Sequence, residues 1–191
     1  LVFLRHYQVS AIKSIQNAIK NDKERFLFEM ATGTGKTKTT IDNISYLYLK
    51  NLCKSALIIA PKSVYSVWKT EFAKHCPDSI EPVFYIWKQT KKNFKWGDPS
   101  KLRIFLINVE ALSTKKGLKA CEEFLRDNRN NITVVDESTT IKNPKALRTK
   151  NILKLRSLSK MRRILTGSPV TKSPLDLYTQ CAFLDPQLLG F

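Results

Sequence analysis

Two glycines and a Lys-Thr pair stand close together near the start of the chain, within the run 31–37. Gly33 and Gly35 let the backbone turn so that its N–H groups point inward at phosphate oxygens. Lys36 can supply a positive charge to the β- and γ-phosphates of a nucleotide, and the Thr37 hydroxyl can contact Mg²⁺. This pattern predicts a loop that binds a nucleoside triphosphate together with Mg²⁺. The predicted nucleotide-binding residues of the loop are Thr32, Gly33, Thr34, Gly35, Lys36 and Thr37.

The loop departs from the general pattern G-x-x-x-x-G-K-[ST] at its first position, which is Met30. The alternative is a Gly/Thr-rich turn between a strand and a helix that happens to contain lysine. That alternative has to account for the preceding apolar run, both glycines and the Lys-Thr pair together, and it offers no reason for them. Phosphate binding is therefore the prediction.

Two adjacent carboxylates end an apolar run much later in the chain, at 132–137. Neighbouring side chains on a strand point opposite ways, but at the end of a strand the chain can turn both acids toward one pocket. Asp136 is then a natural partner for Mg²⁺, and Glu137 can orient or deprotonate the attacking water. Acids at a solvated strand end are the alternative, which the phosphate loop upstream disfavours. We predict Lys36, Asp136 and Glu137 as catalytic residues, with Thr37 and Asp136 holding Mg²⁺.

The elements that must position these residues alternate along the chain. Apolar runs bounded by turn signals predict strands at 26–30, 56–60, 82–87, 103–107, 132–135 and 162–165. Helical stretches are predicted at 9–20, 38–50, 64–75, 119–128 and 145–158. Several apolar runs are too continuous for half-exposed strands and indicate buried parallel ones. We therefore predict an α/β fold with a mostly parallel central sheet and helices on both faces, whose ligands gather at the carboxyl ends of the strands.

Composition limits the class of protein. With 191 residues, 42% of them hydrophobic, the chain has the size of one packed domain. Its four cysteines show no C-x-x-C spacing and it has two histidines, so neither a zinc site nor a disulfide framework is expected. A reducing compartment follows, the cytoplasm or, in a eukaryote, the nucleus.

The charge of the chain is strongly positive. Thirty-three Lys and Arg against 16 Asp and Glu leave +17, which indicates a polyanionic partner. A lysine-rich compositional bias is the alternative, because much of the excess is Lys spread along the chain. Charge alone does not choose among DNA, RNA and a membrane surface. No apolar run approaches the ~20 residues of a membrane span, and no membrane partner is expected.

One long basic loop is predicted at 88–99, and it carries Phe94 and Trp96. Aromatic side chains in a basic loop can stack on the bases of a nucleic acid. The favoured interpretation is a solvated surface loop whose two aromatic side chains pack inward.

The residues that follow the acids resemble a known family. The stretch 136–143, Asp-Glu-Ser-Thr-Thr-Ile-Lys-Asn, is similar to the DExx box of the Swi/Snf-type helicase-like ATPases, where Asp-Glu-x-His-x-Ile-Lys-Asn is typical. Four further segments fit the family's order: 4–8 its Leu-Arg-x-Tyr-Gln opening, 60–72 its motif Ia, 107–110 its motif Ib and 165–170 its motif III. The resemblance covers nearly the whole chain.

The resemblance implies a RecA-like P-loop lobe and a role for each matching residue. Gln8 is expected to contact adenine. Lys62, Ser63 and Asn108 are expected to contact nucleic acid, and Thr166, Gly167 and Ser168 to couple the nucleotide site to it by bonding the DExx carboxylates. The alternatives are a surface glutamine, a helix cap at Ser63 and a plain Gly-Ser-Pro turn. Trp68 and Phe72, four apart on one predicted helix face, are expected in the core.

Two departures from the family pattern bear on its activity. Thr139 stands where the family has His, which puts the usual route from the γ-phosphate to motif III in doubt. This chain has a Gly-Thr-Gly-Lys-Thr loop where the family has Gly-Leu-Gly-Lys-Thr. The Gly-Thr-Gly-Lys-Thr sequence is also found in motor subunits of type I and type III restriction enzymes.

The resemblance implies an ATP- and Mg²⁺-dependent motor that moves along double-stranded DNA. It also implies a second RecA-like lobe, absent from this chain, whose arginine fingers complete the site, so that the lobe alone hydrolyses ATP hardly at all. The alternatives are the motor lobe of a type I or III restriction system and a nucleic-acid-binding lobe that does not hydrolyse ATP.

Overall fold

The computed structural model describes residues 25–29, 35–90, 94–170 and 174–189, together with positions 10, 13, 14, 17 and 21. For 25–29, 174 and 188–189 it describes the backbone alone. Positions 10, 13, 14 and 17 are helical, in agreement with the helix predicted over 9–20, whose other residues lie outside the described part.

Six strands of the described chain form one sheet, in the spatial order β1-β6-β5-β2-β4-β3. They are β1 (Arg25–Glu29), β2 (Ser55–Ile59), β3 (Pro82–Ile86), β4 (Leu102–Ile107), β5 (Asn131–Val135) and β6 (Met161–Thr166). Every pairing between them is parallel. Strands with parallel neighbours on both sides are covered on both faces, which explains why β2, β4 and β5 are buried from end to end.

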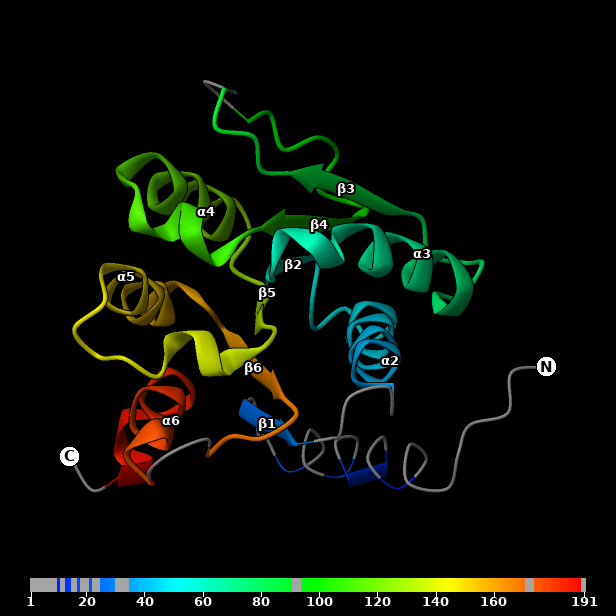
Figure 1. Ribbon diagram of the computed structural model, residues 1–191. Helices are drawn as coiled ribbons and strands as arrows, with labels where there is room; N and C mark the ends of the chain where they lie inside the picture. Colours follow the sequence, from blue (N-terminus) through cyan, green and yellow to red (C-terminus); the bar gives the residue numbers. More distant parts are fainter. Residues whose placement is uncertain are drawn as a thin grey trace.

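Helices cover both faces of this sheet. They are α2 (Lys36–Leu49), α3 (Tyr65–His75), α4 (Lys115–Asp127), α5 (Leu147–Leu155) and α6 (Tyr178–Leu184). Figure 1 shows α2 and α3 on one face and α4, α5 and α6 on the other. The α/β fold with a parallel sheet and helices on both faces, predicted from the alternation of apolar runs, is confirmed.

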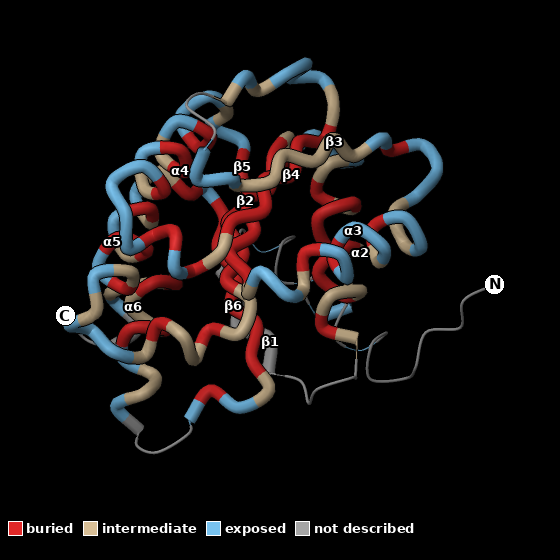
Figure 2. The backbone as a smooth tube through the Cα atoms, turned by 45° about the horizontal axis from the view of Figure 1, so that its top comes forward, coloured by how far each residue is buried: buried red, intermediate tan, exposed pale blue. Residues whose placement is uncertain are grey.

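The central strands divide their side chains between two cores. In β4, Ile104 and Leu106 join the core beneath α2 and α3, whereas Phe105 and Ile107 join the core beneath α4 and α5. This alternation follows from the two-residue period of a strand. Figure 2 shows the result: β2, β4, β5 and β6 form a buried layer through the middle of the molecule, whereas β3 at the edge is half-buried.

Several helix boundaries differ from those predicted. Helix α4 begins four residues before the predicted 119, because the Thr114 Oγ1 accepts a hydrogen bond from the Gly117 N–H at 3.0 Å and caps the helix. A Cβ at Gly117 would lie 2.1 Å from the Ala111 carbonyl oxygen, so this capped turn needs glycine. Helix α5 is shorter than the predicted 145–158, since it follows a turn at 143–146 and ends in the 3₁₀ turn η4 (Arg156–Leu158).

The aromatic residues of the loop at 88–99 pack inward, as predicted. Phe94 and Trp96 stack with ring centroids 5.0 Å apart and an interplanar angle of 5°. The Trp96 ring also meets the rings of Phe105 and Phe124 edge-on, at 5.0 and 4.8 Å. These contacts attach the loop to the core beneath α4.

Candidate nucleotide and nucleic-acid site

The carboxyl ends of the strands lie at one edge of the sheet, because every described strand pair is parallel. The phosphate loop follows β1, Thr166 ends β6 and Asp136 follows β5; β6 lies between the other two, so the ends of β1 and β5 are about 10 Å apart. Lys62 follows β2, and Asn108 follows β4. Within the described residues, the tertiary fold thus brings Lys36, Asp136, Lys62 and Asn108 to adjoining parts of one edge.

The described end of the phosphate loop opens helix α2. Gly35 is the N-cap residue with φ 92° and ψ 31°, a left-handed conformation that favours glycine. Lys36 is 9% exposed, and Thr37 is half-buried in the same first turn. No acidic residue stands in this turn, so its N–H groups keep their positive field for an anion. Gln8, Thr32, Gly33 and Thr34 lie outside the described residues and stay predictions.

The chain turns sharply directly after β5. The Asp136 N–H donates to the Ile59 carbonyl at 2.8 Å, which holds the end of β5 against β2. Glu137 then adopts φ 49°, the left-handed region that a residue with a Cβ rarely enters. Its N–H donates to the Asp136 Oδ1 at 3.0 Å. The backbone turn expected at this strand end therefore uses a conformation that costs free energy. Such conformations are common at functional sites.

The Asp136 carboxylate is enclosed and oriented by a residue of helix α3. The Trp68 Nε1 donates to the Asp136 Oδ2 at 3.0 Å, so each carboxylate oxygen accepts one hydrogen bond. Burial raises the pKa of the Asp136 carboxyl; the Trp68 hydrogen bond opposes this rise, and the charge of Glu137 adds to it. The sequence predicts Trp68 only as a core residue. Trp68 is 1% exposed, so it belongs to the core and also holds the Asp136 carboxylate. Its spacing from Phe72 could predict the first role but not the second.

The 165–170 segment makes its hydrogen bonds within its own turn. The Thr166 Oγ1 accepts from the Ser168 N–H at 3.1 Å, and the Ser168 Oγ donates to the Val170 carbonyl at 2.8 Å. Within the described residues, no hydrogen bond joins either hydroxyl to the carboxylate of Asp136 or Glu137. The direct bond expected between the two segments is not made in this structure: the Ser168 hydroxyl donates to a backbone carbonyl of its own turn, and the Thr166 oxygen accepts a backbone N–H there. Gly167, between them, is half-buried.

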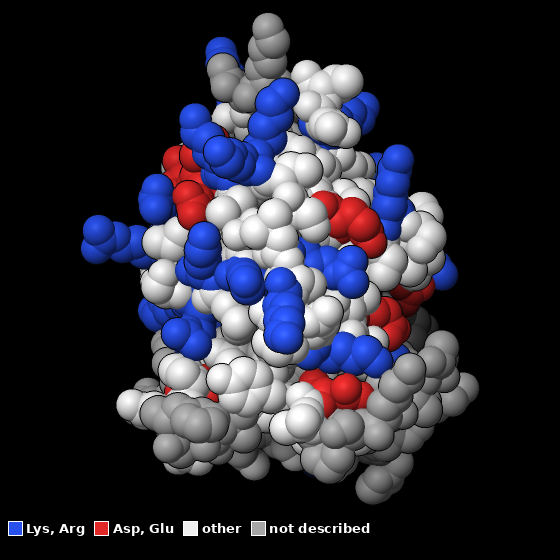
Figure 3. Space-filling view, turned by 60° about the vertical axis from the view of Figure 1, so that its left-hand side comes forward, with Lys and Arg blue, Asp and Glu red and all other residues white. Residues whose placement is uncertain are grey.

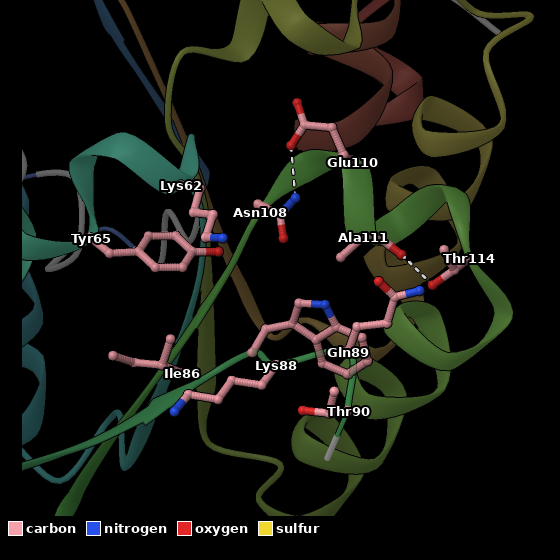
Figure 4. Close-up of a pocket in the computed structure, with 11 residues that line it drawn as sticks. Lys62, Tyr65, Ile86, Lys88, Gln89, Thr90, Asn108, Glu110, Ala111 and Thr114 are labelled. Atoms are coloured by element: carbon pink, nitrogen blue, oxygen red, sulfur yellow. Dashed lines mark hydrogen bonds between the residues drawn. The ribbon is translucent and has the colours of Figure 1, made fainter. Parts of the chain in front are cut away.

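A cavity of about 560 Å³ opens beside the ends of β2, β3 and β4. Figure 4 shows Lys62, Tyr65 and Asn108 converging on it. Tyr65 is 8% exposed, and its hydroxyl has no hydrogen-bond partner in the described part of the chain. The Asn108 Nδ2 donates to the Glu110 Oε2 at 2.8 Å, which lowers the pKa of Glu110. The cavity thus offers a cation, an amide and an unpaired buried hydroxyl to a ligand.

Ser63 lies outside the lining of this cavity and is exposed. It stands in the 3₁₀ turn η1 (Lys62–Val64), while the N-cap of α3 is Val64 without a side-chain hydrogen bond. The alternative of a helix cap at Ser63 is therefore wrong.

Basic side chains also cover a second area. Figure 3 shows Lys and Arg spread over the side of the molecule that carries α4 and α5, with fewer acidic groups among them. A cavity at the amino-terminal edge of β5 and β6 is lined there by Arg126, Arg129 and Lys160. The positive charge is thus distributed over the surface rather than confined to the site edge.

A parallel sheet with a glycine-containing phosphate loop after one strand and an Asp-Glu pair two strands away defines a RecA-like P-loop nucleotide-binding lobe. The family described as "Type III restriction enzyme, res subunit" matches residues 2–169, and the chain belongs to that family.

The named relatives are ATP-dependent helicases, and the matching solved structure is a SWI2/SNF2 ATPase core. The chain is 28% identical to ATP-dependent helicase fft3 of Schizosaccharomyces pombe over 83% of its length, and 30% identical to the probable ATP-dependent DNA helicase CHR23 of Arabidopsis thaliana over 98%. It spans 17% of the length of each of these relatives. The SWI2/SNF2 ATPase core of Sulfolobus solfataricus in complex with dsDNA matches all of the chain at 29% identity and TM-score 0.79; the match covers 37% of that protein.

The relatives and the SWI2/SNF2 core confirm the resemblance drawn from the motifs. Although the family model is named after a restriction subunit, these named relatives are helicases, so the restriction-motor alternative is not favoured. The described residues hold no helix long and apolar enough to cross a membrane.

Proposed function

We propose that this chain is the ATP-binding lobe of a DNA-dependent ATPase of the Swi/Snf type, which couples ATP hydrolysis to movement on double-stranded DNA. The observation that supports this most is the shared edge of the sheet. Residues suited to a nucleotide follow β1 and β5, and residues suited to a phosphate backbone follow β2 and β4, on strands that are bonded to one another. A second lobe of the full-length protein supplies the other wall of the nucleotide site.

The proposed reaction transfers the γ-phosphoryl group of ATP to water. Lys36 and the N–H groups of the α2 N-terminus hold the phosphates by charge and hydrogen bonding. The Glu137 carboxylate orients the attacking water and accepts its proton as the new P–O bond forms and the bond to the ADP oxygen breaks. The backbone turn at Glu137 fixes where this carboxylate can point.

The residues present fit a magnesium ion. Asp136 is a half-buried carboxylate; its surroundings disfavour its negative charge and raise its pKa, and a cation relieves that cost. Asp136 and the Thr37 hydroxyl supply the oxygen ligands that Mg²⁺ prefers. Bound Mg²⁺ would neutralise charge on the β- and γ-phosphate oxygens. Trp68 holds the Asp136 carboxylate in one orientation.

Replacing Trp68 with Phe should weaken the binding of Mg²⁺ at the ATPase site. The variant loses the indole N–H but keeps an aromatic ring in the core, so Asp136 rotates more freely. We expect half-maximal activity to need about 10–100-fold more Mg²⁺, as for other changes behind a metal ligand. The measurement is a Mg²⁺ titration of ATPase rate in the full-length protein.

Phe72→Leu is the matched control, because Phe72 is equally buried on the same helix and touches no carboxylate. It should lower stability without moving the Mg²⁺ titration. Equal Mg²⁺ curves for Trp68→Phe and the wild type would contradict the role given to the indole.

The cavity beside β2 and β4 is proposed to take a phosphate of the nucleic-acid backbone. Lys62 is exposed at its rim and attracts the anion, while the Tyr65 hydroxyl can donate a hydrogen bond that it makes to no described residue. Such contacts carry no sequence information. Binding at this cavity is therefore expected to depend on salt and to be indifferent to sequence.

Removing the charge of Lys62 tests this contact. Lys62→Ala should weaken binding equally for unrelated duplexes and reduce the slope of log K against log salt by about 1. Lys74→Ala removes the same charge from the other end of α3, where Lys74 is exposed and pairs with Glu71, and should leave the slope unchanged. Fluorescence anisotropy at several salt concentrations measures both. The same slope loss in both variants would assign the effect to net charge alone.

The function itself is tested by steady-state ATPase assays on the full-length protein with duplex DNA, single-stranded DNA and RNA as stimulants. The proposal expects the largest stimulation with duplex DNA. A protein that binds duplex DNA but hydrolyses no ATP in its presence would instead be a binding lobe, and preferential stimulation by RNA would make it an RNA motor.

A further inference from the structure

Helix α6 contains a glutamine that is completely buried. Gln180 has no exposed surface, and every polar group of its side-chain amide is used. The Oε1 accepts from the Ser138 Oγ at 2.6 Å, and the Nε2 donates to the carbonyls of Pro169 at 2.8 Å and Asp176 at 2.7 Å. A buried amide of this kind is costly unless all its hydrogen bonds are kept, so it favours one arrangement of its partners.

The partners of Gln180 belong to the two segments that the site needs to connect. Ser138 is buried and follows Asp136 and Glu137 directly, at the start of the 3₁₀ turn η3 (Ser138–Ile141). Pro169 lies in the turn that follows β6, three residues after Thr166. The hydroxyl oxygens of Thr166 and Ser168 each take part in a hydrogen bond within their own turn, and neither is bonded to the acids in this structure. The Gln180 amide bridges this gap.

A purely structural role for Gln180 can be separated from this bridge, because its neighbour has only that role. The Thr179 Oγ1 donates to the Ile141 carbonyl and attaches α6 to the end of η3, with no bond to the turn at 167–170. Thr179 is as fully buried as Gln180. The two residues therefore differ in one respect: Thr179 holds α6 to one segment, whereas Gln180 joins two segments to each other.

We propose that Gln180 is a positioning residue that couples the acid-bearing end of β5 to the turn after β6, so that nucleotide binding at Asp136 and Glu137 is transmitted to that turn through Ser138, Gln180 and Pro169. A shift of Ser138 breaks a buried hydrogen bond unless Gln180 and Pro169 move with it. Thr139 stands where the family has His, so the usual route from the γ-phosphate is in doubt. The proposed coupling uses the side chain of the preceding residue, the buried Ser138, instead. This inference rests on the part of the proposed function that concerns ATP binding. It does not depend on which nucleic acid the protein binds.

Hydrogen exchange on the full-length protein, with and without ATP and Mg²⁺, measures this coupling. In the wild type, ATP should change the exchange rates of backbone amides both at 35–40 and at 166–170. Gln180→Leu and Ser138→Ala should reduce the response at 166–170 by about fivefold or more, the lower range of measured site-to-site couplings. The response at 35–40 and the Kd for ATP should be unchanged. The response at 166–170 should be no smaller in the double variant than in either single variant, because both substitutions break the same hydrogen bond between Ser138 and Gln180.

Thr179→Val is the matched control and should keep the wild-type response at 166–170. Ser138→Ala keeps the test sharp if Gln180→Leu fails to fold, since it removes one hydroxyl and leaves the amide its two carbonyl partners. An equal loss in Thr179→Val would show a merely structural role and overturn the proposal, as would a wild type whose 166–170 amides ignore ATP. A wild type that shows the exchange response but no stimulation by DNA would refute the proposed function and leave this coupling intact.

Discussion

Glu137→Gln is expected to lower kcat of the full-length ATPase by about 10²–10⁴, the range for losing a general base. The change keeps the size of the side chain, and it removes the negative charge together with the ability to accept a proton. ATP affinity should stay at the wild-type value, because the phosphates are held by Lys36 and the α2 N-terminus. Single-turnover hydrolysis and nucleotide titration on the same preparation separate the two quantities.

Glu110→Gln provides the comparison for that experiment. Glu110 is a second carboxylate at the same edge of the sheet, where it accepts a hydrogen bond from Asn108 beside the cavity. Its loss should leave kcat unaltered while changing nucleic-acid binding. A Glu137→Gln enzyme within tenfold of the wild type would mean that another group takes the proton, and Glu137 would then serve only the charge of the site.

Phe105→Ala is expected to cost about 3–5 kcal/mol of unfolding free energy, the range for truncating a buried phenylalanine. Phe105 is fully buried in the middle of β4, and its ring lies 5.2, 5.0 and 5.4 Å from those of Phe94, Trp96 and Phe124. At this chain length each kcal/mol corresponds to about 2–4 °C, so the melting midpoint should fall by about 6–20 °C. Calorimetry and urea titration measure it.

Val67→Ala is the control for that loss, because Val67 is 48% exposed on α3 and its truncation should change stability by no more than about 0.5 kcal/mol.

The Phe105→Ala variant also tests what holds the loop at 88–99 in place. Truncation of Phe105 removes the surface on which Trp96 and Phe94 pack, so the loop should become accessible to protease. A loop that stays protected would show that its own contacts hold it in place.

The arrangement of the site shows where stability is given up for chemistry. Asp136 is half-buried with a raised pKa, and Glu137 occupies a backbone conformation that costs free energy. The chain keeps both directly after a strand whose five residues are all buried. The rigid strand β5 compensates locally, because its backbone is bonded to β2 on one side and β6 on the other.

The sequence by itself determined the elements and the chemistry of the predicted site. Apolar runs of four to six residues separated by helical patterns predict buried parallel strands, and a parallel sheet brings the residues after each strand to one edge. The phosphate loop and the Asp-Glu pair could be found because each is contiguous: the spacing of Gly33, Gly35 and Lys36, or of Asp136 and its neighbour, is local information. Helix ends were less certain, since a single cap such as Thr114 moves a boundary by a full turn.

Only the tertiary structure decided which distant residues meet. Trp68 and Asp136 are 68 positions apart, and Ser138 and Gln180 are 42 apart, yet each pair shares a hydrogen bond. Nothing in local spacing reports such contacts, because they depend on how α3 and α6 pack across the two faces of the sheet. The same holds for the residues predicted to couple the two segments: Thr166 and Ser168 have the right chemistry to bond the acids, but the hydrogen bonds that they make lie within their own turn. Periodicity and motif are properties of neighbours in the chain, whereas the shell around a reactive group is assembled by packing.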